Sequence, residues 1–228
     1  MKSIFEISLK KIILLCLVPV IVVSCSMQRV ANYNNPQKAL VVMDMQLDFL
    51  GENAKLPIEN QVEDLIKTVN DIIEDFNGKG YEIIYIRSVF SKNDIANSFR
   101  NKAAIAGTTG IEIDPRINIV SENIFDKKRS SAFSNKDFEN YLMKNQINEL
   151  YIIGLMVEGC VYKTAISGLD RKYTVNFIEN AVGVWKKKNL EPTKEKLNKK
   201  GAKIITYETK NASATASHYD WAIKKLKN

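Results

Sequence analysis

The chain has 228 residues, of which 45% are hydrophobic and 26% are charged, a balance typical of a globular protein with a sizeable core. This length fits one domain preceded by a targeting segment. The formal net charge is +7, but no basic stripe alternates with aromatic side chains, which argues against a nucleic-acid-binding protein.

Residues 1–24 have the pattern of a secretory signal peptide. Lysines near the start precede an apolar run at 12–23 that is short for a membrane span, and small residues end it. The sequence Val-Val-Ser-Cys at 22–25 resembles a bacterial lipobox, in which Cys25 is lipidated and becomes the first mature residue. We therefore expect a lipoprotein of the bacterial cell envelope, anchored to a membrane through Cys25, with residues 25–37 as a tether. An ordinary signal peptide and an uncleaved anchor are the alternatives.

Residues 38–228 are expected to form one domain, in which apolar runs alternate with segments of helical periodicity. Continuous apolar runs suit parallel strands that are buried on both faces. The expected strands are residues 39–44, 81–87, 123–127, 151–154, 173–178 and 202–207. The expected helices are residues 60–76, 135–145, 160–171 and 191–200, with another from 213 onward. The predicted fold class is α/β, a three-layer α/β/α Rossmann-like fold with a mainly parallel sheet of five to six strands.

The ends of two predicted strands suggest where a ligand binds. Ligands of open α/β sheets bind beyond the carboxyl ends of the strands, near the point where strand order reverses. The first strand ends at Asp44, and the strand at 151–154 ends shortly before Cys160. In a sheet of order 3-2-1-4-5 these strands are neighbours, so we expect Asp44 and Cys160 in one crevice. The long connection at 88–123 is typical of a substrate-binding segment.

Cys160 follows a glycine-bounded turn and is expected at the start of a helix. Unpaired N–H groups and the helix dipole favour an anion there, which would lower the pKa of the thiol and make it a nucleophile. With Cys16 removed and Cys25 lipidated, Cys160 would be the one thiol of the mature domain, without a cysteine partner for a disulfide or zinc site. The alternative is an inert buried cysteine.

Several segments resemble motifs of the isochorismatase-like cysteine hydrolases, a family that includes nicotinamidases. Residues 39–49 resemble the opening motif of the family, and residues 154–165 resemble its nucleophile motif. Residues 127–133 are similar to its lysine segment, and residues 107–118 to its Gly-Thr-x-Gly segment. The resemblance covers about residues 38–207.

The resemblance implies a catalytic triad of Asp44, Lys127 and Cys160. In this triad Cys160 attacks an amide carbonyl, Asp44 carries the thiol proton to the departing amine, and Lys127 keeps Asp44 ionised. Lys128 is adjacent to Lys127, but the spacing to the Ala-Phe pair at 132–133 favours Lys127.

The resemblance also implies a cis peptide bond between Leu155 and Met156. The N–H groups of Met156 and Cys160 would then point into one oxyanion hole.

The chain departs from metal-dependent nicotinamidases, which carry an aspartate and histidines after the second strand. Residues 87–94 contain no histidine, and His218 is the only histidine in the sequence. We therefore expect no histidine-rich metal site and no cofactor, and nicotinamide becomes a less favoured substrate. The candidate substrate-binding residues are Gln46, Phe49, Phe90 and Phe133, the phenylalanines as walls of a pocket for a planar substrate.

Together these features predict an enzyme, a cysteine-dependent amidohydrolase that cleaves the C–N bond of a small amide through a thioester. Vinyl-ether cleavage of the isochorismatase kind, which uses the acid and does not need the thiol, is the first alternative. A surface lipoprotein that keeps the fold as a non-catalytic binding module is the second. The expected partners are a small-molecule substrate and the membrane, with assembly of identical subunits a further expectation.

Overall fold

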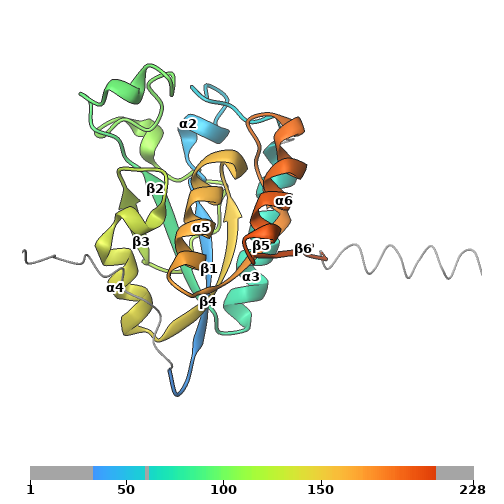
Figure 1. The fold of residues 1–228 in the computed structure, drawn as a ribbon. Helices are drawn as coiled ribbons and strands as arrows, with labels where there is room; N and C mark the ends of the chain where they lie inside the picture. The colour runs from blue at the N-terminus through green and yellow to red at the C-terminus, as the bar shows by residue number, and fades with distance from the viewer. Residues whose placement is uncertain (1–32, 60–61, 209–228) are drawn as a thin grey trace, which may run out of the picture.

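Six strands form one parallel sheet in the order β3-β2-β1-β4-β5-β6 (Figure 1). The computed structural model describes residues 33–59 and 62–208. The strands are β1 Gln37–Met43, β2 Glu82–Ser88, β3 Ile124–Lys127, β4 Ile147–Gly154, β5 Thr174–Val182 and β6 Lys203–Ile205. The chain starts in the middle of the sheet, winds to β3 at one edge, and returns to β4 before it reaches β6. The predicted fold class is therefore confirmed, and the strand order is the 3-2-1-4-5 arrangement considered above with β6 added at one edge.

Helices connect the strands and cover both faces of the sheet. The α-helices are α2 Leu47–Leu50, α3 Val62–Gly78, α4 Lys136–Lys144, α5 Tyr162–Asp170 and α6 Leu190–Lys199. A side-chain oxygen of Asn135 caps α4 by accepting from the N–H of Asp137, as the sequence allows. The short helix α2 was not predicted, because four residues are too few to show a helical period. The helix expected from residue 213, with His218, lies outside the described residues, as do Cys25 and the signal peptide.

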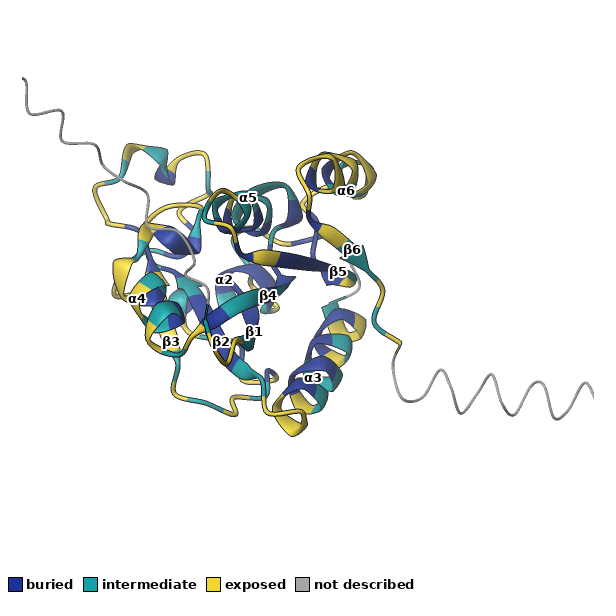
Figure 2. Cartoon of the chain, turned by 60° about the horizontal axis from the view of Figure 1, so that its bottom comes forward, coloured by how far each residue is buried: buried dark blue, intermediate teal, exposed yellow. Residues whose placement is uncertain are grey.

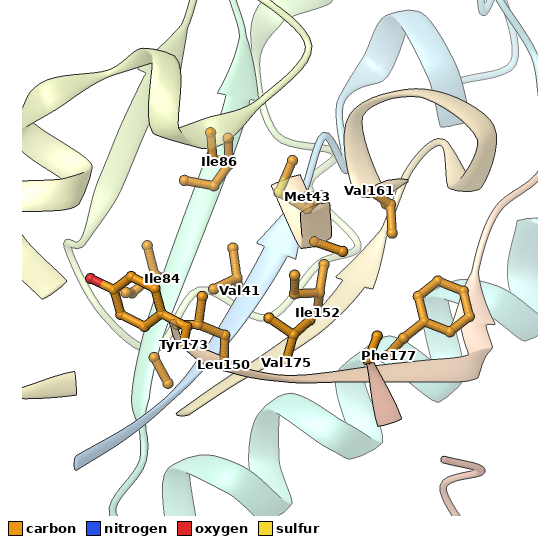
Figure 3. Close-up of a cluster of buried hydrophobic side chains, with 14 of the residues drawn as sticks. Val41, Met43, Ile84, Ile86, Leu150, Ile152, Val161, Tyr173, Val175 and Phe177 are labelled. Carbon is orange, nitrogen blue, oxygen red and sulfur yellow. The ribbon is translucent and has the colours of Figure 1, made fainter. Parts of the chain in front are cut away.

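Alternation along the central strand β1 creates two cores. Val41 and Met43 belong to a core that includes residues of α4, α5 and α6, and Figure 3 shows these side chains facing others from β2, β4 and β5. Leu40 and Val42 point to the opposite face, where they join the apolar stripe of α3. In Figure 2 the strands at the centre are buried, while the outer sides of α3, α4 and α6 are exposed.

β1 and β4 approach closely at their carboxyl ends, where Met43 pairs with Gly154. Gly154 has a φ of +100°, and a Cβ atom there would lie 2.1 Å from the carbonyl oxygen of Met43. Only glycine fits this position, because other residues would clash and would rarely adopt this φ. The contact fixes the relative height of the two strand ends that frame the site described below.

A search for helices that could cross a membrane found none within residues 33–59 and 62–208.

Candidate active site

Four neighbouring strands deliver polar side chains to one edge of the sheet. Asp44 directly follows β1, Ser88 ends β2, and Lys127 ends β3. β4 ends at Gly154 and leads into a π-helical turn, Val157–Val161, that carries Cys160. Because parallel strands end at the same edge, the order β3-β2-β1-β4 collects these residues at the switch point of the sheet.

Hydrogen bonds and an ion pair join these four side chains. The Nζ of Lys127 lies 3.0 Å from Oδ2 of Asp44 and donates to Oγ of Ser88 at 2.6 Å. Lys127 also donates to Sγ of Cys160 at 3.1 Å. The Ser88 hydroxyl in turn donates to Oδ1 of Asp44 at 3.0 Å. The ammonium group therefore has three partners, and both carboxylate oxygens of Asp44 are engaged.

Three of the four side chains are almost entirely removed from water, and Cys160 is half-buried. The exposed fractions of Asp44, Ser88 and Lys127 are 2%, 1% and 1%. Burial by itself would lower the pKa of Lys127, but the charges of Asp44 and Cys160 and their hydrogen bonds outweigh it and raise this pKa above its ordinary value. Lys127 is therefore a cation at neutral pH, and it compensates the charge of Asp44.

The backbone at Asp44 is held in an uncommon conformation. Its φ is 53°, in the left-handed region that few residues other than glycine adopt. The N–H of Asp44 donates to the carbonyl of Ile86 in the neighbouring strand at 2.8 Å. Such conformations persist where surrounding contacts impose them and are concentrated at functional sites.

The structure corrects the expected acidity of Cys160. Burial and the charge of Asp44 raise the pKa of the thiol to about 11, although Lys127 opposes this rise. The expectation of a lowered pKa from a helix N-terminus is wrong, because desolvation and the neighbouring carboxylate outweigh the dipole. Cys160 also lies in the π-helical turn before α5, and not in the first turn of that helix. At neutral pH the resting side chain is a thiol that needs a base to become a nucleophile.

A cavity of about 430 Å³ opens above the cluster. Its apolar lining residues are Phe49, Leu56, Phe90, Leu155, Met156 and Trp185. Its polar and small lining residues are Asp44, Ser88, Arg100, Ser130, Glu158, Gly159, Cys160 and Asn189. Phe49 and Phe90 thus lie where a substrate pocket requires them, and their role in binding stays a prediction.

Phe133 and Gln46 do not line this cavity, which corrects their assignment to the substrate pocket. Phe133 lies in the core, with its ring centroid 5.1 Å from that of Phe138. Gln46 is fully buried, donates to the carbonyls of Ser88 and Ile111, and accepts from the N–H of Ser88. Gln46 therefore holds the end of β2 in place.

The two adjacent lysines have different surroundings. Lys127 points into the cluster, whereas Lys128 is exposed to solvent.

Ser88 was missed by the sequence analysis, although it ends a predicted strand at the same edge as Asp44. A polar residue at the carboxyl end of a buried strand is the signal that could have identified it.

The peptide bond between Leu155 and Met156 is cis, as the resemblance implied. The bond lies between β4 and the turn that carries Cys160, and Leu155, Met156 and Cys160 all line the cavity.

The fold and this cluster define a class: a doubly wound α/β protein with a cysteine, a lysine and a carboxylate at the switch point of its sheet. A family model described as the isochorismatase domain matches residues 38–209. The chain therefore belongs to the isochorismatase-like family and is a hydrolase of that family.

Several amidases are among its relatives. A nicotinamidase from Saccharomyces cerevisiae is 24% identical, with 60% of this chain and 83% of the relative aligned. An N-carbamoylsarcosine amidase from Arthrobacter is 30% identical over 49% of this chain and 47% of its own. The crystal structure of a Pyrococcus horikoshii pyrazinamidase in complex with zinc has a TM-score of 0.68 at 28% identity, and the match covers 75% of this chain and all of that one.

The zinc in the Pyrococcus structure raises the question of a metal site in this chain. Within residues 33–59 and 62–208, no group of three or more His, Cys, Asp or Glu side chains is placed to hold a metal ion. Residues 87–94, at the end of β2 and after it, contain no histidine, and Ser88 and Phe90 lie among them. The Ser88 hydroxyl is engaged by Asp44 and Lys127, and a phenyl ring offers no metal ligand. The described residues do not fit such a metal, and no reaction step is assigned to one.

Proposed function

We propose that this hydrolase is a cysteine-dependent amidohydrolase that cleaves the C–N bond of a small amide through a thioester. The observation that carries the proposal is the buried contact of Lys127 with both Asp44 and Cys160 at the base of a cavity. The amide substrates named for the nicotinamidase and N-carbamoylsarcosine amidase relatives support the same reaction type.

In the first step, Asp44 takes the proton of the Cys160 thiol while Sγ attacks the amide carbonyl carbon. Asp44 becomes neutral as the sulfur becomes anionic, so the net charge of the buried cluster does not change. Lys127 stays protonated and contacts both groups, so it stabilises the negative charge before and after the transfer. The step needs a base because the resting side chain is a thiol, and Asp44 belongs to the same Lys127-linked cluster as the sulfur.

In the second step, negative charge develops on the carbonyl oxygen. The backbone N–H groups of Met156 and Cys160 are the proposed donors of the oxyanion hole. The C–N bond then breaks, and the departing amine takes the proton from Asp44. Asp44 next removes a proton from water, which attacks the thioester to release the acid and restore the Cys160 thiol.

Ammonia release from a panel of small amides tests the proposal, and nicotinamide, pyrazinamide and N-carbamoylsarcosine are the first members. We expect Cys160→Ala to abolish turnover, and intact mass spectrometry of acid-quenched wild-type protein to show an acyl adduct on Cys160. Lys128→Met is the matched control and should keep wild-type turnover. Amide hydrolysis by Cys160→Ala at the wild-type rate would refute the mechanism, and surviving vinyl-ether cleavage in that variant would favour the isochorismatase alternative.

The N-terminal sequence supports a second, separate proposal, that the protein is a lipoprotein of the bacterial cell envelope. The lipobox-like sequence ending at Cys25 carries this proposal, since two or more acyl chains hold a protein at a membrane stably. Mass spectrometry of the N-terminal peptide from a membrane fraction should show acyl chains on Cys25, and Cys25→Ser should lose them. A processed but unmodified N-terminus in the wild-type protein would contradict the anchor.

Light scattering of the domain without its leader checks the expected assembly of identical subunits.

A further inference from the structure

Arg100 is the one cationic side chain among the described residues that line the active-site cavity. It comes from the long connection between β2 and β3, and its guanidinium carbon lies 3.7 Å from the centroid of the Phe90 ring. Its Nη2 donates to Asp94 at 2.7 Å and to Asn97 at 2.8 Å, both in the same connection. The ring covers one face of the guanidinium and two acceptors hold one nitrogen, so the group is fixed in one plane at the cavity wall.

Part of the hydrogen-bonding capacity of Arg100 is unused. The Nε atom is buried, and it has no hydrogen-bond partner among the described residues. Nε is closed to a ligand, but Nη1 is not buried and has no hydrogen-bond partner in the part of the chain that the structure describes, so it is the nitrogen that an acceptor in the cavity can reach.

Contacts with neighbouring residues hold the backbone next to Arg100 in an uncommon conformation. Asn101, Lys102 and Ala104 have φ values of 49°, 57° and 55°, in the left-handed region that disfavours residues other than glycine. The N–H of Ala104 donates to Oδ2 of Asp48 at 2.7 Å, and its carbonyl accepts from the N–H of Phe90 at 2.8 Å. These contacts hold the segment in the one conformation that brings Arg100 to the cavity.

Arg100 is ion-paired with Asp94 through Nη2 alone, and the acidic groups of the cavity have partners too. Asp44 is paired with Lys127. Glu158 accepts from the backbone N–H groups of residues 185 and 186 and from the side chain of Asn189. The remaining wall is largely apolar. A complementary ligand therefore has a short apolar body and one anionic group.

We propose that Arg100 is a specificity-determining residue that receives a carboxylate of the substrate, so that the preferred substrates are small amides that also carry a carboxylate. The inference rests on the proposed amidohydrolase function for its kinetic test, but not for its binding test.

The kinetic test compares monoamides of short dicarboxylic acids with their methyl esters, which share the amide but lack the charge. Wild-type protein should release ammonia from the acids with the higher kcat/KM. Arg100→Met should lower kcat/KM for the acids about 10- to 100-fold, mainly through KM, because one charge-assisted contact is lost far from the reacting bond. The esters should react as with wild type. Arg100→Lys should fall between the two, and Arg129→Met, which removes an exposed charge outside the cavity, should match wild type.

The binding test uses calorimetry with the same compounds on a Cys160→Ala background, so that no turnover is needed. The acid should bind more tightly than its ester, and Arg100→Met should remove the difference. If wild-type protein hydrolyses none of these amides but this binding pattern appears, the proposed reaction fails while the anion site stands. If the acid and ester bind equally, or if Arg100→Met weakens both alike, the assignment of Arg100 is overturned even where amide hydrolysis is observed.

Discussion

Replacing Lys127 with methionine is expected to destabilise the folded protein by about 3–5 kcal/mol, the usual cost of breaking a buried ion pair from one side. The magnitude follows from the surroundings of the ammonium, which is 1% exposed and contacts Asp44, Ser88 and Cys160. Methionine has a similar length and no charge, so Asp44 would remain buried without its counterion. For a domain of this size the change corresponds to a fall in Tm of roughly 6–20 °C.

Urea denaturation followed by circular dichroism measures this loss, with two further variants as references. Lys128→Met removes the adjacent exposed charge and should change the unfolding free energy by less than about 0.5 kcal/mol. The double variant Asp44→Asn, Lys127→Met removes both buried charges and should regain at least half of the loss, because the uncompensated carboxylate is gone. If Lys127→Met stays within about 1 kcal/mol of wild type, or the double variant is no more stable than the single one, the ion-pair reasoning is refuted.

The pH dependence of this difference has a definite sign. The folded-state pKa of Lys127 is raised above its ordinary value of 10.5. Its contribution to stability is therefore fully present below the unfolded pKa and is lost as pH rises through the folded pKa. The gap between wild type and Lys127→Met should be constant from neutral pH to about pH 10 and shrink above it.

Three other predictions concern neighbouring positions. With its pKa raised to about 11, Cys160 should react with iodoacetamide about 10-fold more slowly at pH 7 than an ordinary free thiol. Asp44→Asn should speed the reaction, because the carboxylate charge contributes to the raised pKa. A labelling rate that levels off below pH 8 would contradict the raised pKa. Ser88→Ala should lower stability by about 1–3 kcal/mol and slow ammonia release about 10- to 100-fold, because Asp44 loses a hydrogen bond. Unchanged kinetics would contradict a role for Ser88 in supporting Asp44. Gly154→Ala should prevent folding or cost more than about 3 kcal/mol, whereas Gly78→Ala, with open space around it, should be neutral or slightly stabilising; equal melting temperatures for the two variants would show that the close approach is unimportant.

The sequence was sufficient to predict the sheet and the gathering of Asp44 and Cys160, and the family resemblance added Lys127. Buried parallel strands have a strong apolar signature, and the strand order then places their carboxyl ends together. Phe133 was misplaced because a core phenylalanine and a cavity phenylalanine are both buried and have the same local pattern. The acidity of Cys160 was misjudged because the helix N-terminus is visible in the sequence, whereas desolvation and the distance to a carboxylate are not.

The connection that carries Arg100 is hydrogen-bonded to the turn after β1 at several points. Asp48 accepts from the N–H of Ala104, and Gln46 donates to the carbonyl of Ile111. The segment that carries Arg100 and the strand end that carries Asp44 are thus held by one turn, so a substitution at Gln46 or Asp48 would displace both sides of the cavity together.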